Sequence, residues 1–259
     1  MLEIKNVYKT FLKGTPDANT IFQNFNLQIP KGQFVNIIGS NGSGKTTLLN
    51  LISGTSKVDS GQIVYSGKDI SKQAEFKRAK IIGRVFQNPA LGTAKNLTVI
   101  ENLSLAANKG KTLNLSKAVN KRDREKYYEL LKSLGMGLEN RLEQKCESLS
   151  GGQRQALALL MACLFEPQIL ILDEHTAALD PRSANTIMEL TRQLVEQYKF
   201  TVLMVTHNLN HALQYGDRIL MMHQGKILMD ESDSTKDKLI LDDVLDKFYS
   251  ISIEVGNGV

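Results

Sequence analysis

The sequence is poor in the features that would mark a disulfide scaffold or a membrane span. Its 259 residues include only two cysteines, Cys146 and Cys163, whose spacing fits neither a metal site nor a redox motif. The longest uninterrupted apolar run covers residues 156–165, about half of the roughly 20 residues that a membrane-spanning helix needs. We therefore expect free thiols in a reducing compartment and a buried helix over the apolar run.

Signals for export and for repeats are also missing. Residues 1–5 lack the basic-then-apolar pattern of a signal peptide, and the chain has no low-complexity tract or repeat of fixed period. Hydrophobic residues make up 42% and charged residues 23%, as in an ordinary globular domain. We expect a protein that stays in the cytosol and receives any membrane spans from other chains.

The net charge of +5 is concentrated in residues 109–132, which hold eight basic and three acidic side chains. A solvated helix face explains this segment most simply. Contact with an anionic membrane surface or with nucleic acid is the alternative. The segment has only two aromatic residues, Tyr127 and Tyr128, so base stacking has little support and no nucleic-acid partner is expected.

One glycine-rich stretch fits the phosphate-loop pattern G-x-x-x-x-G-K-[ST]; it consists of Gly39, Ser40, Asn41, Gly42, Ser43, Gly44, Lys45 and Thr46. An apolar run precedes it and a helix-like run over 47–53 follows it, which is the context that the motif requires. Backbone N–H groups of such a loop point at phosphate oxygens. Lys45 can reach the β- and γ-phosphates and Thr46 can ligate Mg²⁺. A Gly/Ser turn that happens to end in Lys-Thr is the less favoured alternative.

A second stretch places two acids at the end of an apolar strand over 169–172. Asp173 is expected to hold Mg²⁺ through water, and Glu174 to polarise the attacking water. A solvated strand exit is the ordinary alternative, and the phosphate loop elsewhere in the chain argues against it.

A third stretch, 149–153, contains Ser150 and the paired glycines Gly151 and Gly152 before a helix expected over 155–165. It offers a second helix start suited to an anion. Because one phosphate loop needs no second such site in the same chain, this stretch is expected to serve a second copy of the protein.

Apolar patterning predicts strands that alternate with helices, and hence a mostly parallel α/β core with an antiparallel β edge. The strand-poor middle predicts an inserted helical sub-domain. The expected division is a single domain, 1–259, with a catalytic core of 1–87 and 166–259 and a helical sub-domain of 88–165. Strands are expected at 2–7, 25–29, 34–38, 63–65, 81–86, 169–172 and 200–205, a hairpin at 219–229, and further helices at 99–106, 124–134, 182–198 and 239–248.

The order of these motifs resembles that of the nucleotide-binding subunit of an ATP-binding-cassette (ABC) transporter, over about residues 2–230. In that family the fold is a P-loop NTPase (RecA-like) core. Gln87 matches the Q-loop glutamine, residues 149–153 the signature motif, Asp173 and Glu174 the Walker B pair, 178–180 the D-loop, and His207 the switch histidine. Phe11 stands where the family has an adenine-stacking aromatic residue, with Tyr8 as the other candidate.

The resemblance implies an ATPase in which two copies dimerise head to tail around ATP and Mg²⁺. The implied catalytic residues are Glu174, His207 and Gln87, and the implied metal ligands are Thr46, Gln87 and Asp173. The implied nucleotide contacts are Phe11, Gly39, Ser40, Asn41, Gly42, Ser43, Gly44, Lys45, Thr46, Thr47, Ser150, Gly151, Gly152 and Gln153. The implied partners are transmembrane permease subunits and, through them, an extracytoplasmic solute-binding protein, with the chain at the cytoplasmic face of the membrane.

Transport in the uptake direction is the favoured function, because separate ATPase chains are usual for bacterial importers. The segments 87–94 and 174–181 resemble a branch of uptake ATPases, some of them linked to aromatic amino acids. An exporter or lipoprotein-extraction system is the first alternative, and a soluble ABC ATPase outside transport is the second. Glu174 and His207 argue against a binding module without catalysis.

Three features depart from the pattern or distract from it. His175 replaces the proline that commonly follows the Walker B glutamate, and a tolerated loop substitution is favoured over a role at the γ-phosphate or dimer contact. Residues 120–123 match the guanine-selecting N-K-x-D pattern, but without the strand that should precede it, so the match is read as chance. His211 is expected to be structural and His223 to lie in a solvated turn.

Overall fold

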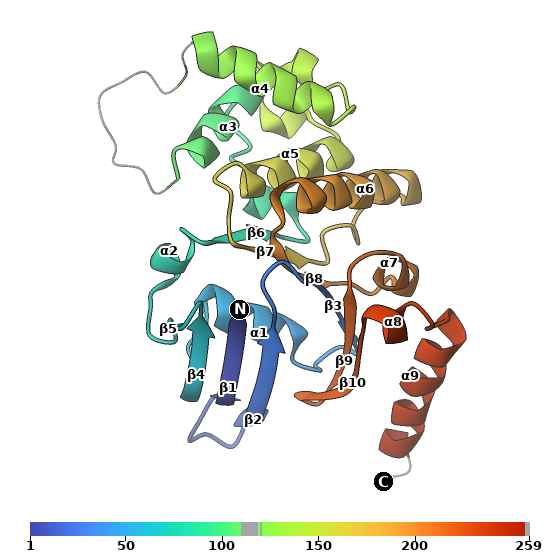
Figure 1. The fold of residues 1–259 in the computed structure, drawn as a ribbon. Helices are drawn as coiled ribbons and strands as arrows, with labels where there is room; N and C mark the ends of the chain where they lie inside the picture. Colours follow the sequence, from blue (N-terminus) through green and yellow to red (C-terminus); the bar gives the residue numbers. More distant parts are fainter. Residues whose placement is uncertain (110–118, 120, 257–259) are drawn as a thin grey trace. The chain divides into compact units, whose positions relative to one another are not determined.

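The computed structural model describes residues 1–109, 119 and 121–256, and it divides the chain into two compact units (Figure 1). The first unit comprises Met1–Arg78 and Thr201–Val259, and the second comprises Ala79–Phe200. Together they combine antiparallel and parallel strands with helices, which confirms the expected α/β class. The predicted division at residues 87/88 and 165/166 stays a prediction, because the second unit also holds two strands and a long helix.

An antiparallel sheet forms one part of the first unit. Its strand order is β2 (Asn19–Ile29), β1 (Leu2–Phe11), β4 (Ser60–Tyr65) and β5 (Lys68–Asp69). Phe25, Leu27 and Ile29 alternate with exposed residues along β2, so one face of the strand is buried. This sheet is the predicted antiparallel edge, although β1, β2 and β4 are longer than their apolar patterns indicate.

The other strands of the first unit carry the phosphate loop. All six residues of β3 (Phe34–Gly39) are buried, and β3 pairs in parallel with β8 (Thr201–Val205) and β9 (Arg218–His223). β10 (Lys226–Ser232) pairs antiparallel with β9, which confirms the expected hairpin. Helices α1 (Lys45–Ser53), α2 (Glu75–Arg78), α7 (Leu209–Gln214), α8 (Asp233–Lys236) and α9 (Leu241–Gly256) complete this unit.

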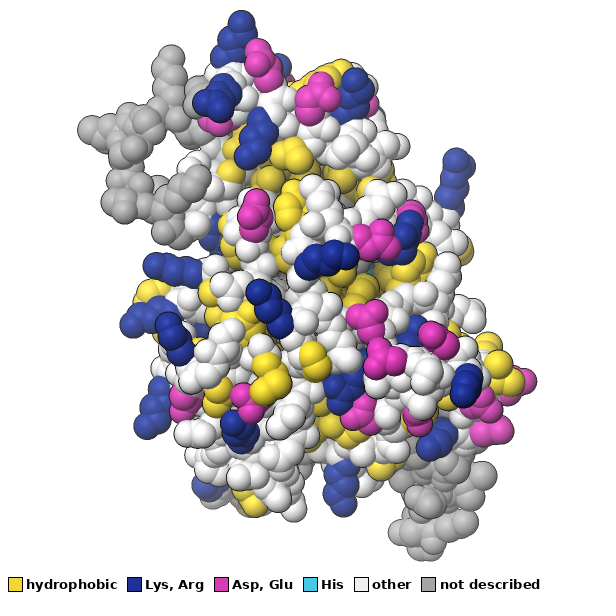
Figure 2. Space-filling view, in the orientation of Figure 1, with side chains coloured by type: hydrophobic (Ala, Val, Ile, Leu, Met, Phe, Trp, Pro, Cys, Tyr) yellow, Lys and Arg dark blue, Asp and Glu magenta, His cyan; other side chains and the backbone are white. Residues whose placement is uncertain are grey.

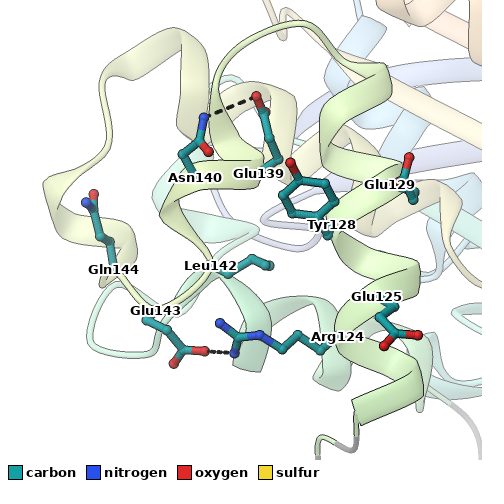
Figure 3. A pocket seen from close by; sticks show the side chains of 9 residues that line it. All are labelled: Arg124, Glu125, Tyr128, Glu129, Glu139, Asn140, Leu142, Glu143 and Gln144. Carbon is teal, nitrogen blue, oxygen red and sulfur yellow. Dashed lines mark hydrogen bonds and ion pairs between the residues drawn. The ribbon is translucent and has the colours of Figure 1, made fainter.

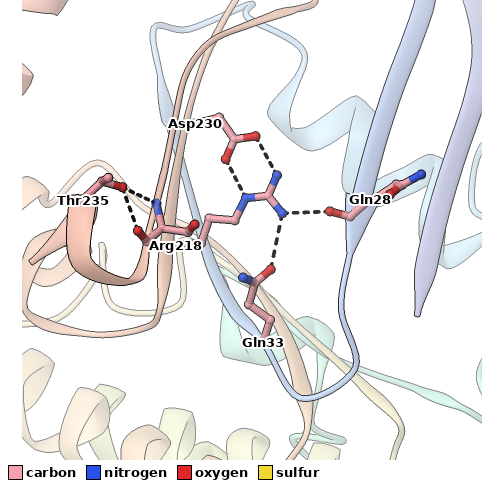
Figure 4. Close-up of polar contacts among 6 residues, drawn as sticks. Gln28, Gln33, Arg218, Asp230 and Thr235 are labelled. Carbon is pink, nitrogen blue, oxygen red and sulfur yellow. Dashed lines mark hydrogen bonds and ion pairs between the residues drawn. The ribbon is translucent and has the colours of Figure 1, made fainter.

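A partly buried arginine ties the ends of three of these strands together (Figure 4). Arg218 at the start of β9 forms a bidentate pair with Asp230 on β10, with both N–O distances at 2.6 Å. Its remaining nitrogen donates to the backbone oxygen of Gln28 on β2 at 2.8 Å. Bidentate guanidinium–carboxylate pairs fix geometry as well as charge, so Arg218 holds the hairpin against the antiparallel sheet.

The second unit combines two parallel strands with helices. β6 (Ile82–Val85) pairs with β7 (Ile169–Asp173), and Gly83 lets the backbone of helix α5 (Gly151–Cys163) approach, since a Cβ there would lie 2.5 Å from the Ala162 oxygen. The helices are α3 (Val99–Ala107), α4 (Lys121–Ser133), α5 (Gly151–Cys163) and α6 (Pro181–Tyr198), with short 3₁₀ turns at Pro89–Leu91, Leu138–Arg141 and Cys146–Ser148.

Most predicted helices of both units are confirmed, with shifted ends. The helix expected over 155–165 begins at Gly151 and ends at Cys163, because Ser150 caps it with a reciprocal capping box. The final helix begins at Leu241 rather than residue 239 and continues to Gly256. The short helix α2 has no apolar repeat of its own and was not predicted.

The basic segment 109–132 is only partly visible, since residues 110–118 and 120 lie outside the described residues. Its described part is mainly α4, where Arg124 pairs with Glu143, and Figure 2 shows basic and acidic side chains interspersed around this helix. This mixture supports the solvated-face interpretation. The N-K-x-D match opens α4 at Lys121–Asp123, so its described part is helical, as expected for a chance match.

A cavity of about 550 Å³ opens beside α4 (Figure 3). Its lining combines Tyr128 and Leu142 with four glutamates and Arg124, and all of it comes from residues 124–144. None of the predicted nucleotide residues lines this cavity. Among the helices that the structure describes, none is both long enough and apolar enough to cross a bilayer.

Candidate nucleotide-binding site

The phosphate loop has the curled backbone that its glycines predict. Gly39, Gly42 and Gly44 have φ angles of 148°, 78° and 102°, a region that other residues rarely adopt. A Cβ at Gly39 would lie 2.2 Å from the Met222 oxygen, so β9 also excludes any side chain there. Tight packing and backbone conformation together require glycine at this position.

Lys45 is almost fully buried inside this loop, with 6% of its surface exposed. Its Nζ donates to the backbone oxygens of Gly39 and Ser40, both at 2.8 Å. The ammonium group is thus held among oxygen acceptors at the start of α1, where a phosphate can replace or add to them as a partner.

The start of α1 is open to an anion. Its N-cap is Gly44, which has no side chain to accept from the N–H groups of the first turn. The N–H groups in the first turn of such a helix point towards the position that a bound phosphate would take.

The phosphate loop and the predicted switch histidine line one cavity of about 470 Å³. Gly39, Ser40 and Asn41 contribute one side, and Thr206 and His207 at the end of β8 contribute another. Strands β3 and β8 are parallel neighbours, so their carboxyl ends meet at the same edge. The structure therefore brings His207 to the loop although 160 residues of chain intervene between Thr46 and His207.

Two apolar side chains of α9, Leu245 and Phe248, also line this cavity. They were missed at the sequence level, where 239–248 was read only as a final helix. α9 is anchored by Val244, which is buried in a cluster with Ile38 and Met221. The three-residue spacing of Leu245 and Phe248 signals a helix face, but only packing shows that this face reaches the phosphate loop.

The β9–β10 hairpin contacts the phosphate loop at two points. The Gly225 N–H donates to the Ser43 oxygen at 3.0 Å, and His223 Nδ1 lies 3.4 Å from Ser40 Oγ. His223 is the last residue of β9, directly before the turn, and it is partly exposed while it contacts the phosphate loop. His211 on α7 is 5% exposed and packs edge-on to Tyr215, in agreement with its expected structural role.

The two aromatic candidates for adenine lie near the end of β1. Phe11 is 39% exposed and Tyr8 is 43% exposed, so both side chains are accessible to a ligand. Lys9 Nζ lies 4.9 Å from the centre of the Phe11 ring. The assignment of Phe11 as the stacking residue stays a prediction.

In the second unit, the acids of the Walker B motif stand at the end of β7. Asp173 is the last residue of the strand, and its Oδ2 accepts from Nη2 of Arg84 at 2.7 Å. Glu174 follows with φ at 48°, a left-handed conformation that costs energy for a residue with a side chain. Strain of this kind is common where a catalytic side chain has to be aimed.

His175 packs inside the second unit. It is 2% exposed, and its Nε2 lies 3.2 Å from Thr191 Oγ1 on α6. The residue before a proline avoids helical conformations and prefers an extended one. Histidine at 175 is therefore compatible with the left-handed Glu174 and also anchors the turn to α6.

The signature motif and the D-loop pack together in the second unit. Ser150 Oγ accepts from the Gln153 N–H at 3.2 Å, and Gln153 Nε2 donates to the Met136 oxygen at 3.1 Å. A Cβ at Gly152 would lie 3.1 Å from Ser183 Oγ, whereas one at Gly151 would meet Leu179 at an ordinary 3.6 Å. The two motifs therefore share one packed corner.

Asp180 of the D-loop is the N-cap of α6. Its Oδ1 accepts from the Ser183 N–H at 3.1 Å. Hydrogen bonds from the Ser183 side chain and backbone lower the pKa of Asp180 below its ordinary value. The cap is therefore ionised at neutral pH and complements the positive end of the helix.

Gln87 follows β6 and is exposed. The residue before it is held from the signature helix, because Gln155 Nε2 donates to the Phe86 oxygen at 3.2 Å. Gln155 is 1% exposed and was not singled out from the sequence. The sequence signal that could have identified it is a polar residue on the apolar face of the helix.

The predicted metal ligands have the chemistry that Mg²⁺ requires. Thr46, Gln87 and Asp173 offer a hydroxyl, an amide oxygen and a carboxylate, and Mg²⁺ takes oxygen ligands, usually one or two carboxylates together with substrate phosphates and water. Within the described residues, no cluster of three or more His, Cys, Asp or Glu side chains suits a metal held by protein alone. The donor set therefore fits an ion that arrives with a nucleotide.

The geometry thus divides the predicted site between the units. The first unit holds the phosphate loop, His207, Phe11 and Thr46, and the second holds the Walker B acids, Gln87, the signature motif and the D-loop.

The family model described as ABC transporter matches residues 22–177, which is more than half of the chain.

The chain belongs to the ABC transporter ATPase family. It is 50% identical over 248 residues to the "Tyrosine transport ATP-binding protein" of Clostridioides difficile (strain R20291), with 96% of this chain and 98% of that protein covered. It is 34% identical over 232 residues to the "Spermidine/putrescine import ATP-binding protein PotA" of Haemophilus influenzae, of which it covers 58%.

Solved structures agree with this ABC fold. A dimeric ATP-binding cassette in a post-hydrolysis state, bound to ADP and Pi, matches with a TM-score of 0.76 at 32% identity and covers 90% of this chain and 98% of its own. A nucleotide-free cassette matches with a TM-score of 0.78 at 26% identity. The expected P-loop NTPase fold and the ATPase function of the chain are thereby confirmed.

Proposed function

We propose that this ABC ATPase drives the uptake of an aromatic amino acid of the tyrosine type through separate permease subunits. One observation carries the proposal: half of the residues are identical to those of a tyrosine transport ATP-binding protein over nearly the full length of both chains. The exporter alternative has no such support, since other relatives are named for the import of polyamines and phosphonates.

In this proposal two copies close around two ATP molecules. Each ATP is held by the phosphate loop of one copy and by the signature residues of the other. The first turn of α1, which has no side-chain cap, and the start of α5, where Ser150 caps only the Gln153 N–H, supply N–H donors on both sides of the triphosphate. Ser150 keeps its hydroxyl proton for the γ-phosphate, because its oxygen only accepts in the capping box.

Within the closed dimer, Glu174 orients the attacking water and accepts its proton, and His207 contacts the γ-phosphate. Thr46, Asp173 and Gln87 would hold Mg²⁺, which would supply positive charge to neutralise the phosphates. Gln87 reports the state of the site to the permease, and a solute-binding protein delivers the amino acid outside. Hydrolysis of ATP then reopens the dimer, so the chemical step controls the conformational change. In this arrangement the chain is held at the cytoplasmic face of the membrane by its permease.

Replacement of Glu174 by Gln tests this function. Glu174→Gln removes the proton acceptor and keeps the phosphate contacts, so ATP binding is retained, turnover falls by at least about a hundredfold, and a dimer accumulates. Size-exclusion chromatography with and without ATP·Mg²⁺ measures the dimer. A chain that stays monomeric with ATP·Mg²⁺ would rule out the nucleotide sandwich.

The solute is tested by uptake. Cells that lack the gene for this chain should lose accumulation of radiolabelled tyrosine, and the native chain should restore it. The matched control is Glu174→Gln, which should not restore uptake. Normal tyrosine uptake without the chain would remove the aromatic amino acid from the proposal and leave the ATPase assignment intact.

A further inference from the structure

An arginine that no nucleotide motif includes is paired with the proposed magnesium ligand. Arg84 lies on β6 opposite Ile171 of β7, and Asp173 is two residues further along β7. Side chains two residues apart on a strand share a face, so Arg84 and Asp173 are diagonal neighbours on one face of the β6–β7 pair. The ladder itself therefore places the guanidinium beside the carboxylate.

Arg84 and Asp173 form a charge-assisted hydrogen bond that is largely shielded from solvent. Arg84 Nη2 lies 2.7 Å from Asp173 Oδ2, and the two side chains are only 14% and 15% exposed. At this exposure water screens the two charges far less than at the surface. The pair therefore holds most of its Coulomb attraction.

The guanidinium also contacts an aromatic ring. Its central carbon lies 4.8 Å from the centre of the Phe86 ring, and Phe86 is two residues beyond Arg84. A cation over an aromatic face is stabilised and oriented. The backbone of Phe86 is itself tied to α5, since its oxygen accepts from the buried Gln155.

A cation thus already stands against the carboxylate to which the proposed function assigns Mg²⁺. We propose that Arg84 is an internal counter-cation that competes with Mg²⁺ for Asp173, so that the site takes the metal only together with the phosphates of a nucleotide. Two cations that share one carboxylate repel each other, which weakens Mg²⁺ binding without ATP. The triphosphate adds negative charge that offsets the two cations, so Mg²⁺ can bind beside Arg84. This inference rests on the assignment of Asp173 as a magnesium ligand.

The test measures Mg²⁺ affinity rather than activity. All proteins carry Glu174→Gln, so that nucleotide is not consumed, and the fluorescent nucleotide mant-ATP is titrated with MgCl₂. Arg84→Met keeps the apolar stem against Phe86 and removes the charge. We expect the Mg²⁺ concentration at half-saturation to fall roughly tenfold, the effect expected of one partly buried charge. Arg84→Lys, which keeps the charge, should stay near the native value.

Two matched variants separate competition from a structural role. Arg192→Met removes an arginine from a carboxylate pair of the same 2.7 Å length, with Glu196 on the exposed face of α6, and should leave the Mg²⁺ half-saturation unchanged. In a protein that already carries Asp173→Asn, adding Arg84→Met should no longer change the Mg²⁺ half-saturation, since the shared carboxylate is gone. If Arg84→Met proves unstable, the comparison of Arg84→Lys with Arg84→Gln supplies the same charge difference.

The outcomes are distinct. An unchanged or raised half-saturation in Arg84→Met, with a normal Mg²⁺ response of the unsubstituted Arg84 protein, would overturn the competition and leave the proposed function standing. Binding of mant-ATP that does not respond to Mg²⁺ even with Arg84 and Asp173 in place would overturn the magnesium assignment and the inference together.

Discussion

Several buried polar side chains in this molecule are placed by the polar groups with which they form hydrogen bonds. Lys45 is held by loop carbonyls, Asn36 bonds the end of a helix, and His175 meets a threonine inside the second unit. Each is a polar group almost without solvent contact. Buried polar groups require hydrogen-bond partners. The effect of replacing each one on affinity or stability can therefore be predicted from its burial and its partners.

The first residue-scale prediction concerns nucleotide affinity. Lys45→Ala removes the one buried cation of the phosphate loop, and we expect the affinity for ATP to fall by roughly ten- to a hundredfold, the loss of a hydrogen bond to a charged group. Isothermal titration calorimetry measures it. Lys236→Met is the matched control, because Lys236 is also 6% exposed and donates to a backbone oxygen, that of Leu213 at 2.7 Å. Equal losses in both variants would show that Lys45 acts only through stability.

The second concerns pH. Burial lowers the pKa of His211 below 6.5, so the folded state binds fewer protons than the unfolded state at acid pH. Stability is therefore complete above about pH 6.5 and falls as the pH drops towards the lowered pKa, by at most about 1.4 kcal/mol per pH unit. His211→Phe keeps the ring contact with Tyr215 and should lose this component. Urea unfolding at pH 7.5 and 5.5 measures the difference, and identical pH slopes in the two proteins would contradict it.

At the scale of elements, the buried strand β3 determines where the phosphate loop begins. Its two neighbours, β8 and β9, lie far along the chain: β9 pairs with β3 as far as Gly39, and β8 ends at Val205, two residues before the predicted switch histidine. Parallel strands buried on both faces read as continuous apolar runs, which is why β3, β7 and β8 were predictable from sequence. The exception in β3 is Asn36.

Asn36 connects β3 to the end of α7. It is fully buried, and its Nδ2 donates to the Ala212 oxygen at 3.0 Å and to the Tyr215 oxygen. Asn36→Leu would leave both helix-end oxygens without this donor, and we expect a loss of about 2 kcal/mol of unfolding free energy. Ile37→Leu in the same strand is the volume-conserving control and should cost less than about 1.5 kcal/mol. Chemical denaturation distinguishes them, and equal losses would exclude a specific role for the amide.

For the whole molecule, the proposed dimer makes each chain half of two sites, because it pairs the phosphate loop of one copy with the signature motif of the other. A mixture of variants tests this. Lys45→Ala disables the phosphate loop, and Gly151→Asp places a negative charge where the other copy's γ-phosphate should lie. The new side chain meets Leu179 at an ordinary 3.6 Å and stands in the first turn of α5, so the fold should tolerate it.

Each variant alone should be inactive, because neither homodimer has a complete site. An equimolar mixture should recover roughly a quarter of native turnover, since half of the randomly formed dimers contain one intact site. Phosphate release measures it, and a mixture without recovery would contradict two independent composite sites. Gly152→Asp is the less suitable variant, because its side chain would be crowded by Ser183 at 3.1 Å.

The sequence by itself determined what is encoded over short distances. The phosphate loop, the capped signature helix and the acids that end β7 are each specified within about ten residues by glycines, caps and apolar runs. These local features also carried the prediction of the α/β class and of the nucleotide function. Element ends were less certain, because capping by Ser150 and packing of α9 moved them by several residues.

Only the tertiary structure decided which distant residues meet. Leu245 and Phe248 join the cavity of the phosphate loop because α9 is anchored by Val244. His175 reaches Thr191 across the interior of the second unit. Arg84 and Asp173, 89 residues apart, form an ion pair because parallel pairing of β6 with β7 sets their register. Strand register is fixed by the burial of whole faces, and no local pattern in either strand contains it.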